Sequence, residues 1–368
     1  MTGSSRFYAL DALRGLAIAL MILVNTPGSW QHVYSPLLHA SWDGFTFADI
    51  VFPAFLFVVG AAMFYALRHT SLTVATVQRI VKRGVLLVAI GILLNWFPFT
   101  HSVNELRLPG VLQRIGLCYM LAALLVLLIK VRYIPLLSIA LLALYWILLL
   151  TFGGGQPFSL SGNAVLKLDM LLFGSNHLYQ GFGIAFDPEG LLSTLPAVVS
   201  VLVGYYVAAK LVQHSPRAGA LWLVKFAAVL FIAAWLCSTF WPVNKALWSG
   251  SYVLLSSAIL LLILAVLVWV SDVMAKRALV QPLITYGTNP LFIYILSWLW
   301  AVCLSLIPAG NSNLYQFSFE LLTTVLAPTT SSSTDLRRVI FSPDRSYKPT
   351  ANRCGRSCVD PTGIVGTS

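Results

Sequence analysis

Long apolar stretches alternate with short polar segments along most of the chain. A helix needs about 20 apolar residues to cross the hydrocarbon core of a bilayer. Nine stretches are close to this length: residues 8–26, 46–67, 80–97, 108–129, 133–152, 191–211, 220–241, 247–270 and 283–307. A tenth, 314–327, has 14 residues and contains Glu320, and so short a stretch more often re-enters or lies in the interface. The pattern predicts an all-α, polytopic membrane bundle of about nine to ten transmembrane helices.

The composition points to the same class. Of the 368 residues, 58% are hydrophobic and 10% are charged, whereas a soluble domain has about 25% charged residues. So few charges cannot cover a water-facing surface, which excludes an ordinary cytosolic enzyme, a disordered chain or a small disulfide scaffold. The net charge of +11 would indicate nucleic-acid binding in a soluble protein. In a membrane protein it indicates orientation instead, and we expect no nucleic-acid partner.

The Lys and Arg residues divide the loops into two sets. With nine spans, one set of alternating loops holds twelve Lys and Arg residues, and the opposite set holds only Arg107, Lys167 and Lys245. Basic loops face the cytoplasm. We therefore expect a cytoplasmic N-terminus, with the weakly charged loops on the outer side of the membrane.

Polar side chains interrupt several spans, where they are costly and mark structural or functional sites. Asp11 and Arg14 lie three residues apart on the first span, which favours a structural ion pair. The others gather at the expected outer ends of the spans: Asn25, Asp49, Gln113, Arg114, Asn244 and Lys245. For Arg114 and Lys245, a structural role and anion binding both stay open.

Histidine is the most informative residue type. His39 precedes the sequence Ala-Ser-Trp-Asp-Gly at the polar entry to the second span. A histidine near its ordinary pKa can act as a base or nucleophile at neutral pH. His177, in the second long outer loop, is the next candidate. The cysteines show no metal-binding spacing, and we expect no metal site. Both long outer loops are rich in aromatic and hydrogen-bonding residues, which suits a sugar but also an interfacial belt.

Six segments occur in order at the span boundaries: LDALRGLAIALMILVN, LLHASWDGFTFADIVFPAFLFVVG, LPGVLQRIG, FDPEGLLSTLPA, WPVNKALWS and YGTNPLFIYI. Together they resemble the heparan-α-glucosaminide N-acetyltransferase family, including its shorter bacterial members, over residues 8–316. The resemblance implies a transferase that moves acetyl from cytoplasmic acetyl-CoA, its co-substrate, to the amine of glucosamine or a related amino sugar at the periplasmic face. It also implies a place in the bacterial inner membrane and, by analogy, a homodimer.

The resemblance also implies residue roles. The family's functional histidine falls on His39 and its outer-end asparagine on Asn25. His39 then deprotonates the acceptor amine or itself carries the acetyl group, and Asn25 stabilises the oxyanion. Either Asp43 or Asp49 orients the imidazole or binds the ammonium of the acceptor.

We expect the coenzyme to contact four residues at the outer ends of the spans, namely Gln113, Arg114, Asn244 and Lys245. We expect the acceptor to contact three residues of the long outer loops: Trp42, Asp187 and Glu189. These seven roles complete the expected site around His39.

Two other functions stay open. A membrane O-acyltransferase of surface polysaccharide has a similar LDALRG-like opening but often places a histidine where this chain has Asn25. A sugar transporter without covalent chemistry is the other alternative. The sequence Thr288-Asn289-Pro290 would give it a broken helix, although no internal repeat is visible.

The last part of the chain differs in composition from the rest. Residues 1–327 form the expected transmembrane acyltransferase domain. Residues 328–368 are rich in Ser, Thr, Pro and Arg, and the nine-span count would place this basic tail outside, against the positive-inside rule. We therefore expect a disordered, aberrant C-terminus of the kind that a frame shift produces.

Overall fold

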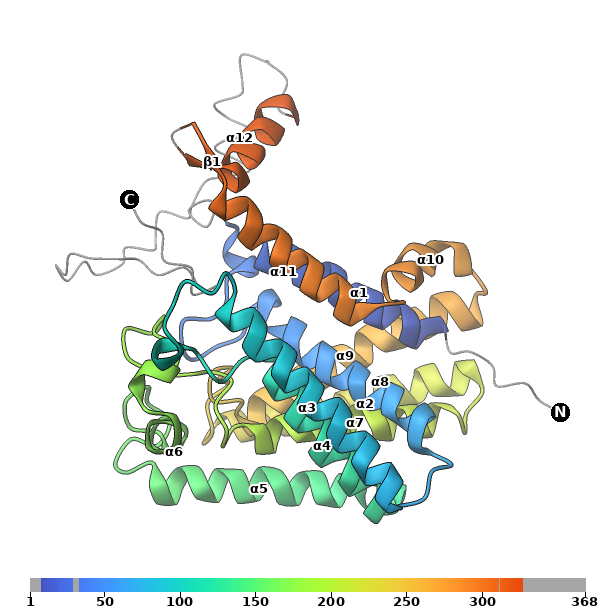
Figure 1. Ribbon diagram of the computed structural model, residues 1–368. Helices are drawn as coiled ribbons and strands as arrows, with labels where there is room; N and C mark the ends of the chain where they lie inside the picture. The colour runs from blue at the N-terminus through green and yellow to red at the C-terminus, as the bar shows by residue number, and fades with distance from the viewer. Residues whose placement is uncertain (1–7, 29–32, 311, 327–368) are drawn as a thin grey trace.

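The computed structural model describes residues 8–28, 33–310 and 312–326, and the expected tail, 328–368, lies outside them. The described chain is a bundle of helices with one very small hairpin, β1 (Pro308–Ala309) and β2 (Ser312–Asn313) (Figure 1). The helices are α1 (Tyr8–Asn25), α2 (Val51–Leu67), α3 (Val74–Trp96), α4 (Val111–Leu128), α5 (Ile134–Phe152), α6 (Ala164–Phe173), α7 (Thr194–Leu211), α8 (Pro216–Ser238), α9 (Gly250–Val268), α10 (Arg277–Tyr286), α11 (Pro290–Leu306) and α12 (Leu314–Leu326). The predicted all-α class is confirmed.

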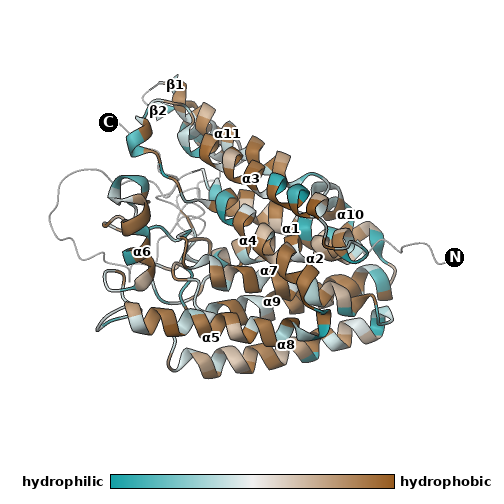
Figure 2. Cartoon of the chain, turned by 60° about the horizontal axis from the view of Figure 1, so that its bottom comes forward, coloured by the Kyte–Doolittle hydropathy of each residue, from teal (hydrophilic) through white to brown (hydrophobic). Residues whose placement is uncertain are grey.

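Within the described residues, seven segments are long and apolar enough to cross a membrane, and each matches an expected span. Figure 2 shows hydrophobic residues along the helix bodies and hydrophilic ones mainly at their ends. The chain is therefore an integral membrane protein. The seven segments are Tyr8–Asn25, Phe47–Leu67, Val111–Leu128, Val131–Phe152, Thr194–Leu211, Pro216–Ser238 and Gly250–Val273.

The remaining expected spans form helices of a different kind. α3 has 23 residues, but Arg79, Lys82 and Arg83 lie in its first half, so its uninterrupted apolar run is short. The ninth expected span is two helices, α10 and α11, which meet at an angle of 63°. The break lies at the predicted position, because Pro290 cannot continue the preceding helix. The short tenth stretch is the 13-residue helix α12.

Close packing between α2 and α7 forms the centre of the bundle. A Cβ atom on Gly60 would lie 1.8 Å from the carbonyl oxygen of Val201, and one on Gly204 would lie 1.9 Å from that of Phe57. Only glycine allows the two backbones to approach so closely, as is common where membrane helices cross. α5 and α8 lie at the periphery, with large apolar side chains exposed along their lengths. The rigid α2–α7 pair therefore supports whatever is attached to the start of α2.

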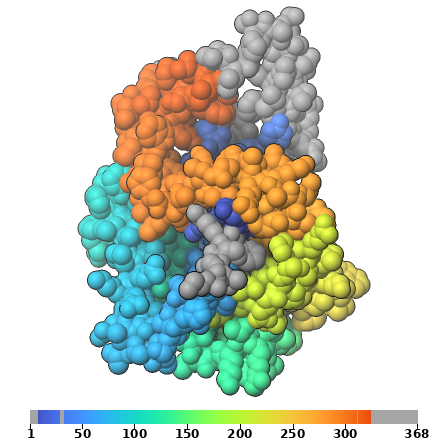
Figure 3. Space-filling view, turned by 90° about the vertical axis from the view of Figure 1, so that its right-hand side faces the viewer, coloured from blue at the N-terminus to red at the C-terminus, as the bar shows by residue number. Residues whose placement is uncertain are grey.

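The two ends of the bundle differ in the length of their connections. At one end, called the loop end, long segments follow α1, α3, α5 and α8 and lead into the next helices; it is on the left of Figure 1. At the other, called the basic end, the orange α10 lies above the α2–α3 and α7–α8 turns, which are light blue and yellow-green (Figure 3). Basic side chains cluster there, including Arg68, Lys130, Arg132, Lys210, Arg217, Lys276 and Arg277.

Candidate active site

Asp49 is the centre of the site at the loop end. It lies in the short 3₁₀ turn Phe47–Ile50 that leads into α2, and its side chain is 0% exposed. Its Oδ2 accepts hydrogen bonds from the backbone nitrogen and hydroxyl of Thr46 at 2.9 and 3.0 Å. Thr46 and Asp49 thus cap each other reciprocally. From α9, the hydroxyl of Tyr252 donates to the carbonyl oxygen of Asp49 at 2.7 Å.

Two further side chains meet the other oxygen of this carboxylate. Nδ1 of His39 lies 2.8 Å from Asp49 Oδ1, and Nζ of Lys245 lies 3.3 Å from the same oxygen. Lys245 Nζ also lies 2.8 and 3.2 Å from Nδ1 and Nε2 of His39. The side chains of His39 and Lys245 are 42% and 19% exposed. Two distant segments, the α1–α2 connection and the loop before α9, thus build one cluster, His39–Asp49–Lys245.

The surroundings favour a neutral imidazole. Burial lowers the pKa of His39, and the charge of Lys245 lowers it further, while the hydrogen bond to Asp49 opposes both. Burial also lowers the pKa of Lys245, against the charges of Asp49 and Glu189. Because a carboxylate only accepts, we assign the proton of His39 to Nδ1, from which it donates to Asp49. Nε2 then keeps its lone pair, and Nζ of Lys245 lies 3.2 Å from it.

Asp43 and Asn244 hold together the two loops that carry this cluster. Asn244 Nδ2 donates to Asp43 Oδ1 at 3.1 Å, and the backbone nitrogen of Gly44 donates to the carbonyl oxygen of Val243 at 2.8 Å. Asn244 is buried, and its Oδ1 accepts from the backbone of Leu247 at 2.8 Å. Of the two aspartates left open by the sequence, Asp49 therefore contacts the imidazole and Asp43 joins the loops.

A cavity of about 1960 Å³ extends from the cluster into the bundle. Its wall includes His39 and Lys245, and it follows α2 from Val51 to Leu67. α2 has 17 residues, so the cavity runs roughly 25 Å along the helix. In its basic half the wall includes Arg83, whose guanidinium lies 5.8 Å from the ring centre of Tyr119. The volume exceeds the roughly 300–1,000 Å³ of most ligand pockets.

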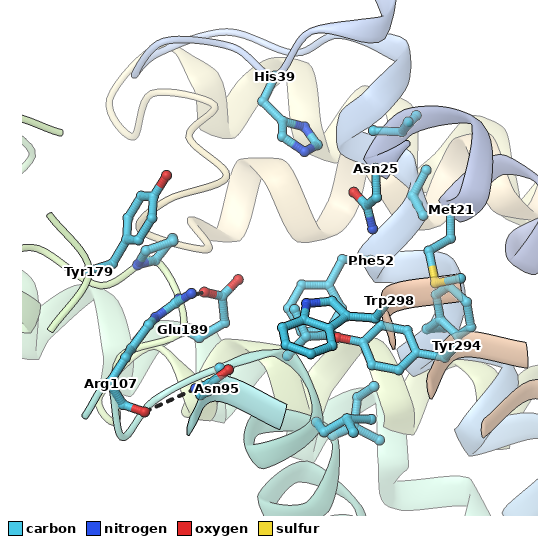
Figure 4. A pocket seen from close by; sticks show the side chains of 18 of the residues that line it. Met21, Asn25, His39, Phe52, Asn95, Arg107, Tyr179, Glu189, Tyr294 and Trp298 are labelled. Carbon is cyan, nitrogen blue, oxygen red and sulfur yellow. Dashed lines mark hydrogen bonds and ion pairs between the residues drawn. The ribbon is translucent and has the colours of Figure 1, made fainter. Parts of the chain in front are cut away.

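Four other sequence-predicted residues share this wall with His39, namely Asn25, Trp42, Glu189 and Lys245. Asn25, at the end of α1, points into the cavity beside His39 (Figure 4). Trp42 lines the same cavity, and its indole nitrogen donates to the carbonyl oxygen of Phe158 at 2.9 Å. Its ring packs edge-on against Phe186 at 5.3 Å. The geometry brings Asn25, His39 and Trp42 together.

Across the cavity lies an ion cluster that includes Arg107, which the sequence analysis did not assign to the site (Figure 4). Arg107 makes two hydrogen bonds to Asp187, at 2.8 and 2.9 Å, and one to Glu189 at 2.6 Å. The ring of Tyr179 lies 4.8 Å from its guanidinium. Arg107 was one of only three basic residues in the outer loops, a signal that could have identified it.

The two acids of this cluster have different surroundings. Burial acts to raise the pKa of Asp187, but the charge and hydrogen bonds of Arg107 outweigh it and lower the pKa. Asp187 is 0% exposed and does not belong to the described cavity wall. Burial raises the pKa of Glu189, which does line the cavity. Of the three residues expected to contact the acceptor, Glu189 and Trp42 line the cavity, and Asp187 instead holds Arg107.

Gln113 and Arg114 lie behind the described cavity wall rather than on it. Gln113 donates to the carbonyl oxygen of Leu108 at 3.1 Å. Arg114 is buried, donates to the carbonyl oxygen of Gly190 at 2.8 Å and to the hydroxyl of Ser193, and stacks over Trp248. The geometry gives these two residues and Asn244 structural partners and offers no support for their expected contact with the coenzyme. Of that set, Lys245 lines the cavity.

In the part of the chain that the structure describes, no group of three or more His, Cys, Asp and Glu side chains could hold a metal ion. The donor set around His39 is one imidazole, one carboxylate and one amine. Such a set suits proton transfer or nucleophilic attack.

Fold and site together define a polytopic membrane protein with a histidine–aspartate site at one end of a long cavity. The family model described as heparan-alpha-glucosaminide N-acetyltransferase, catalytic, matches residues 6–239, and the chain belongs to this family of acyltransferases. It is 30% identical to heparan-alpha-glucosaminide N-acetyltransferase of Mus musculus over 361 residues, covering 80% of this chain and 53% of the relative. It is 31% identical to heparan-alpha-glucosaminide N-acetyltransferase of Homo sapiens over 358 residues, covering 79% of this chain and 52% of the relative. The chain spans about half the length of these curated relatives, and the resemblance noted in the sequence is confirmed.

A buried acid supports the loop that carries Glu189. Asp169, on α6, is 0% exposed, and its Oδ1 accepts a hydrogen bond from the backbone of Leu191 at 2.9 Å. Burial raises its pKa to about 7, against the opposing effect of that hydrogen bond. In the unfolded chain a carboxyl titrates near 4. The folded form therefore binds the extra proton between about pH 4 and 7, and this acid destabilises the fold as the pH rises through that range.

We expect Asp169→Asn to remove this effect. The amide keeps the acceptor for Leu191 and has no charge to bury. At pH 8 the variant should unfold at a higher temperature than the native chain. Its free energy of unfolding should be greater by up to about 4 kcal/mol. At pH 5 the difference should shrink. Thermal unfolding in detergent at both pH values measures it, with the exposed Glu105→Gln as control. An equal effect at both pH values would contradict the account.

Proposed function

We propose that this chain is a membrane acetyltransferase that moves the acetyl group of acetyl-CoA to the amine of glucosamine or a related amino sugar. The observation that carries the proposal is the imidazole of His39, held by the buried Asp49 at the loop end of a cavity that follows the full length of α2. Membership of the N-acetyltransferase family supports the same chemistry.

The reaction needs a base, because a protonated amine has no lone pair. Nε2 of His39 takes a proton from the ammonium group of the acceptor, and the freed nitrogen attacks the thioester carbonyl carbon. The C–S bond then breaks, and the leaving thiolate takes this proton from the imidazolium. The new amide nitrogen loses its second proton through the regenerated imidazole to water, so the products are the N-acetylated sugar, free coenzyme A and one proton. Asn25 lies beside His39 (Figure 4), where its amide N–H can donate to the oxyanion of the tetrahedral intermediate. An acetyl-histidine intermediate is the alternative route.

The acceptor binds at the loop end, between His39 and Glu189. Figure 4 shows these two side chains facing the cavity from opposite sides. The carboxylate of Glu189 is fixed by Arg107 and can accept hydrogen bonds from an ammonium or a hydroxyl group. Trp42 offers an apolar ring face of the kind on which sugars stack. Asp187 acts indirectly, because it holds Arg107.

The donor reaches the same point from the basic end. The cavity wall includes Arg83, whose charge suits the phosphates of a coenzyme. The basic end carries the residues that the positive-inside rule places in the cytoplasm, where acetyl-CoA is made. We therefore propose a cytoplasmic N-terminus, and the bacterial inner membrane as the location. The homodimer implied by the resemblance stays a prediction.

A sugar transporter remains the second candidate, and one observation favours it. The cavity is large, and one of its walls is α11, which meets α10 at a sharp break of the kind found in transporters. The two candidates differ in one product: only the transferase makes N-acetylated sugar.

We expect His39→Ala to abolish transfer. Purified protein in detergent or liposomes receives radiolabelled acetyl-CoA and glucosamine, and labelled N-acetylglucosamine is measured. Loss of the base should lower the rate by about 10²–10⁴-fold. His214→Ala is the matched control, since this histidine lies at the basic end and its Nδ1 is bonded to the carbonyl oxygen of Lys210.

Activity that survives in His39→Ala would remove His39 from the mechanism and leave His177 as the next candidate. If the native chain makes no labelled product but accumulates free glucosamine in liposomes, the transporter is the better account.

We expect Arg83→Gln to weaken donor binding. Loss of one charge-assisted contact, worth about 1.5–3 kcal/mol, should raise the KM for acetyl-CoA about 10–100-fold and leave the KM for glucosamine unchanged. Arg79→Gln is the control, because Arg79 is exposed on the same helix and is not among the cavity residues. Steady-state kinetics with each substrate varied in turn provide the measurement. Equal effects of the two substitutions would contradict the proposed path.

A further inference from the structure

Lys245 occupies a position that binding of the coenzyme does not explain. Its Nζ lies within 3.3 Å of Asp49 Oδ1 and within 3.2 Å of both ring nitrogens of His39. Its side chain is only 19% exposed. An ammonium that serves chiefly to hold a phosphate would keep its donors free toward the cavity, whereas this one is already directed at the cluster.

The turn that carries Lys245 is built to hold it there. The backbone nitrogen of Trp248 donates to the carbonyl oxygen of Lys245 at 2.9 Å, and Trp248 has a positive φ of 52°. A non-glycine residue in this conformation is uncommon and persists only where its surroundings enforce it. Asn244, which directly precedes Lys245, donates a hydrogen bond to Asp43 in the loop that carries His39. The lysine and the imidazole thus have a fixed relative position.

The charges facing His39 come from three other segments. Asp49 lies at the start of α2, and Lys245 lies in the loop before α9. Glu189, on the loop before α7, acts on Lys245 and is itself bound by Arg107. Without Lys245, the nearest charge to the imidazole would be a buried carboxylate, and an adjacent opposite charge favours the protonated form of histidine. A protonated His39 could not accept a proton from the acceptor.

We propose that Lys245 is a positioning residue that supplies the cation for Asp49 and thereby keeps the imidazole of His39 neutral. This inference rests on the proposed function, in which His39 is the base. It assigns Lys245 to control of the base instead of to coenzyme binding. The substitution Lys245→Arg keeps the positive charge at this position. The substitution Lys245→Met removes the charge but keeps a side chain of similar length with an apolar stem.

The test measures the protonation of His39 without relying on catalysis. Diethyl pyrocarbonate acylates neutral imidazole, so its rate of reaction at His39, followed by peptide mass spectrometry from pH 5 to 8.5, gives the midpoint of protonation. The native chain is compared with Lys245→Met, Lys245→Arg and the control Lys167→Met. Lys167 lies on α6 at the same end of the bundle and donates to the carbonyl oxygen of Phe152.

We expect the His39 midpoint of the native chain to lie below the ordinary value of about 6.5. In Lys245→Met it should rise by about one pH unit or more, since a like charge beside the imidazole disfavours its protonated form and is then absent. Lys245→Arg and Lys167→Met should stay near the native value. A midpoint in Lys245→Met equal to or below that of the native chain would overturn the proposal.

A second pair of variants covers the case in which Lys245→Met does not fold because Asp49 is left buried and unpaired. Asp49→Asn should lower the His39 midpoint below the native value, because the cation then acts alone. Adding Lys245→Met to it should raise the midpoint again. Equal midpoints in the single and double variants would contradict the proposal.

Kinetics then separate the inference from the function on which it rests. In Lys245→Met the pH at which kcat/KM rises should increase together with the His39 midpoint. The KM for acetyl-CoA should change by less than about two-fold. If the KM for acetyl-CoA rises and the pH dependence of kcat/KM does not change, Lys245 binds the coenzyme and does not control His39. If no variant or native chain makes product, the proposed function fails, while the midpoints still decide the relation between Lys245 and His39.

Discussion

The site depends on a carboxylate buried in the turn that leads into α2. A buried charge is costly unless it is paired and hydrogen-bonded. Asp49 meets this requirement with groups from three parts of the chain: Thr46 beside it, His39 ten residues before it and Lys245 almost two hundred residues after it. Removing one partner of such a cluster leaves an uncompensated charge, so the loops that supply these partners are held in place by the same interaction that prepares the imidazole.

The helices around Asp49 differ in how firmly they pack. α2 carries Asp49 at its start and crosses α7 at Gly60 and Gly204 with no room for a side chain. α11, which forms another wall of the cavity, has one buried side chain, Val302. The site thus begins on a helix that packs closely against its neighbour, while α11 leaves most of its side chains partly or fully exposed.

Much of this fold could be predicted from the sequence, because a bilayer leaves few choices. The spans, the break before Pro290 and the distribution of basic residues all follow from length, hydropathy and the cost of charges in hydrocarbon. His39 and Asn25 were found because each is a polar residue at the end of a span, next to a recognisable motif. The structure places both on one cavity wall.

Other features needed the three-dimensional structure. α4 is apolar nearly all round, so nothing in its periodicity showed that Gln113 and Arg114 face away from the cavity. Asp43 lies in an irregular loop and Asp49 in the short turn that follows it. No repeating pattern in such a segment shows which aspartate contacts the imidazole and which one joins the loops. The link from Arg107 to Asp187 crosses 80 residues and has no local signature. Pairings of this kind depend on how loops fold back, which single-sequence patterns do not encode.

The proposed function requires that one cavity bring a donor from the basic end to an acceptor at the loop end. Proteoliposomes of known orientation, with glucosamine sealed inside and labelled acetyl-CoA outside, test this requirement. In molecules whose basic end faces outward, the account predicts labelled N-acetylglucosamine inside the vesicles and free coenzyme A outside. Product that forms only when both substrates are on the same side of the membrane would contradict it.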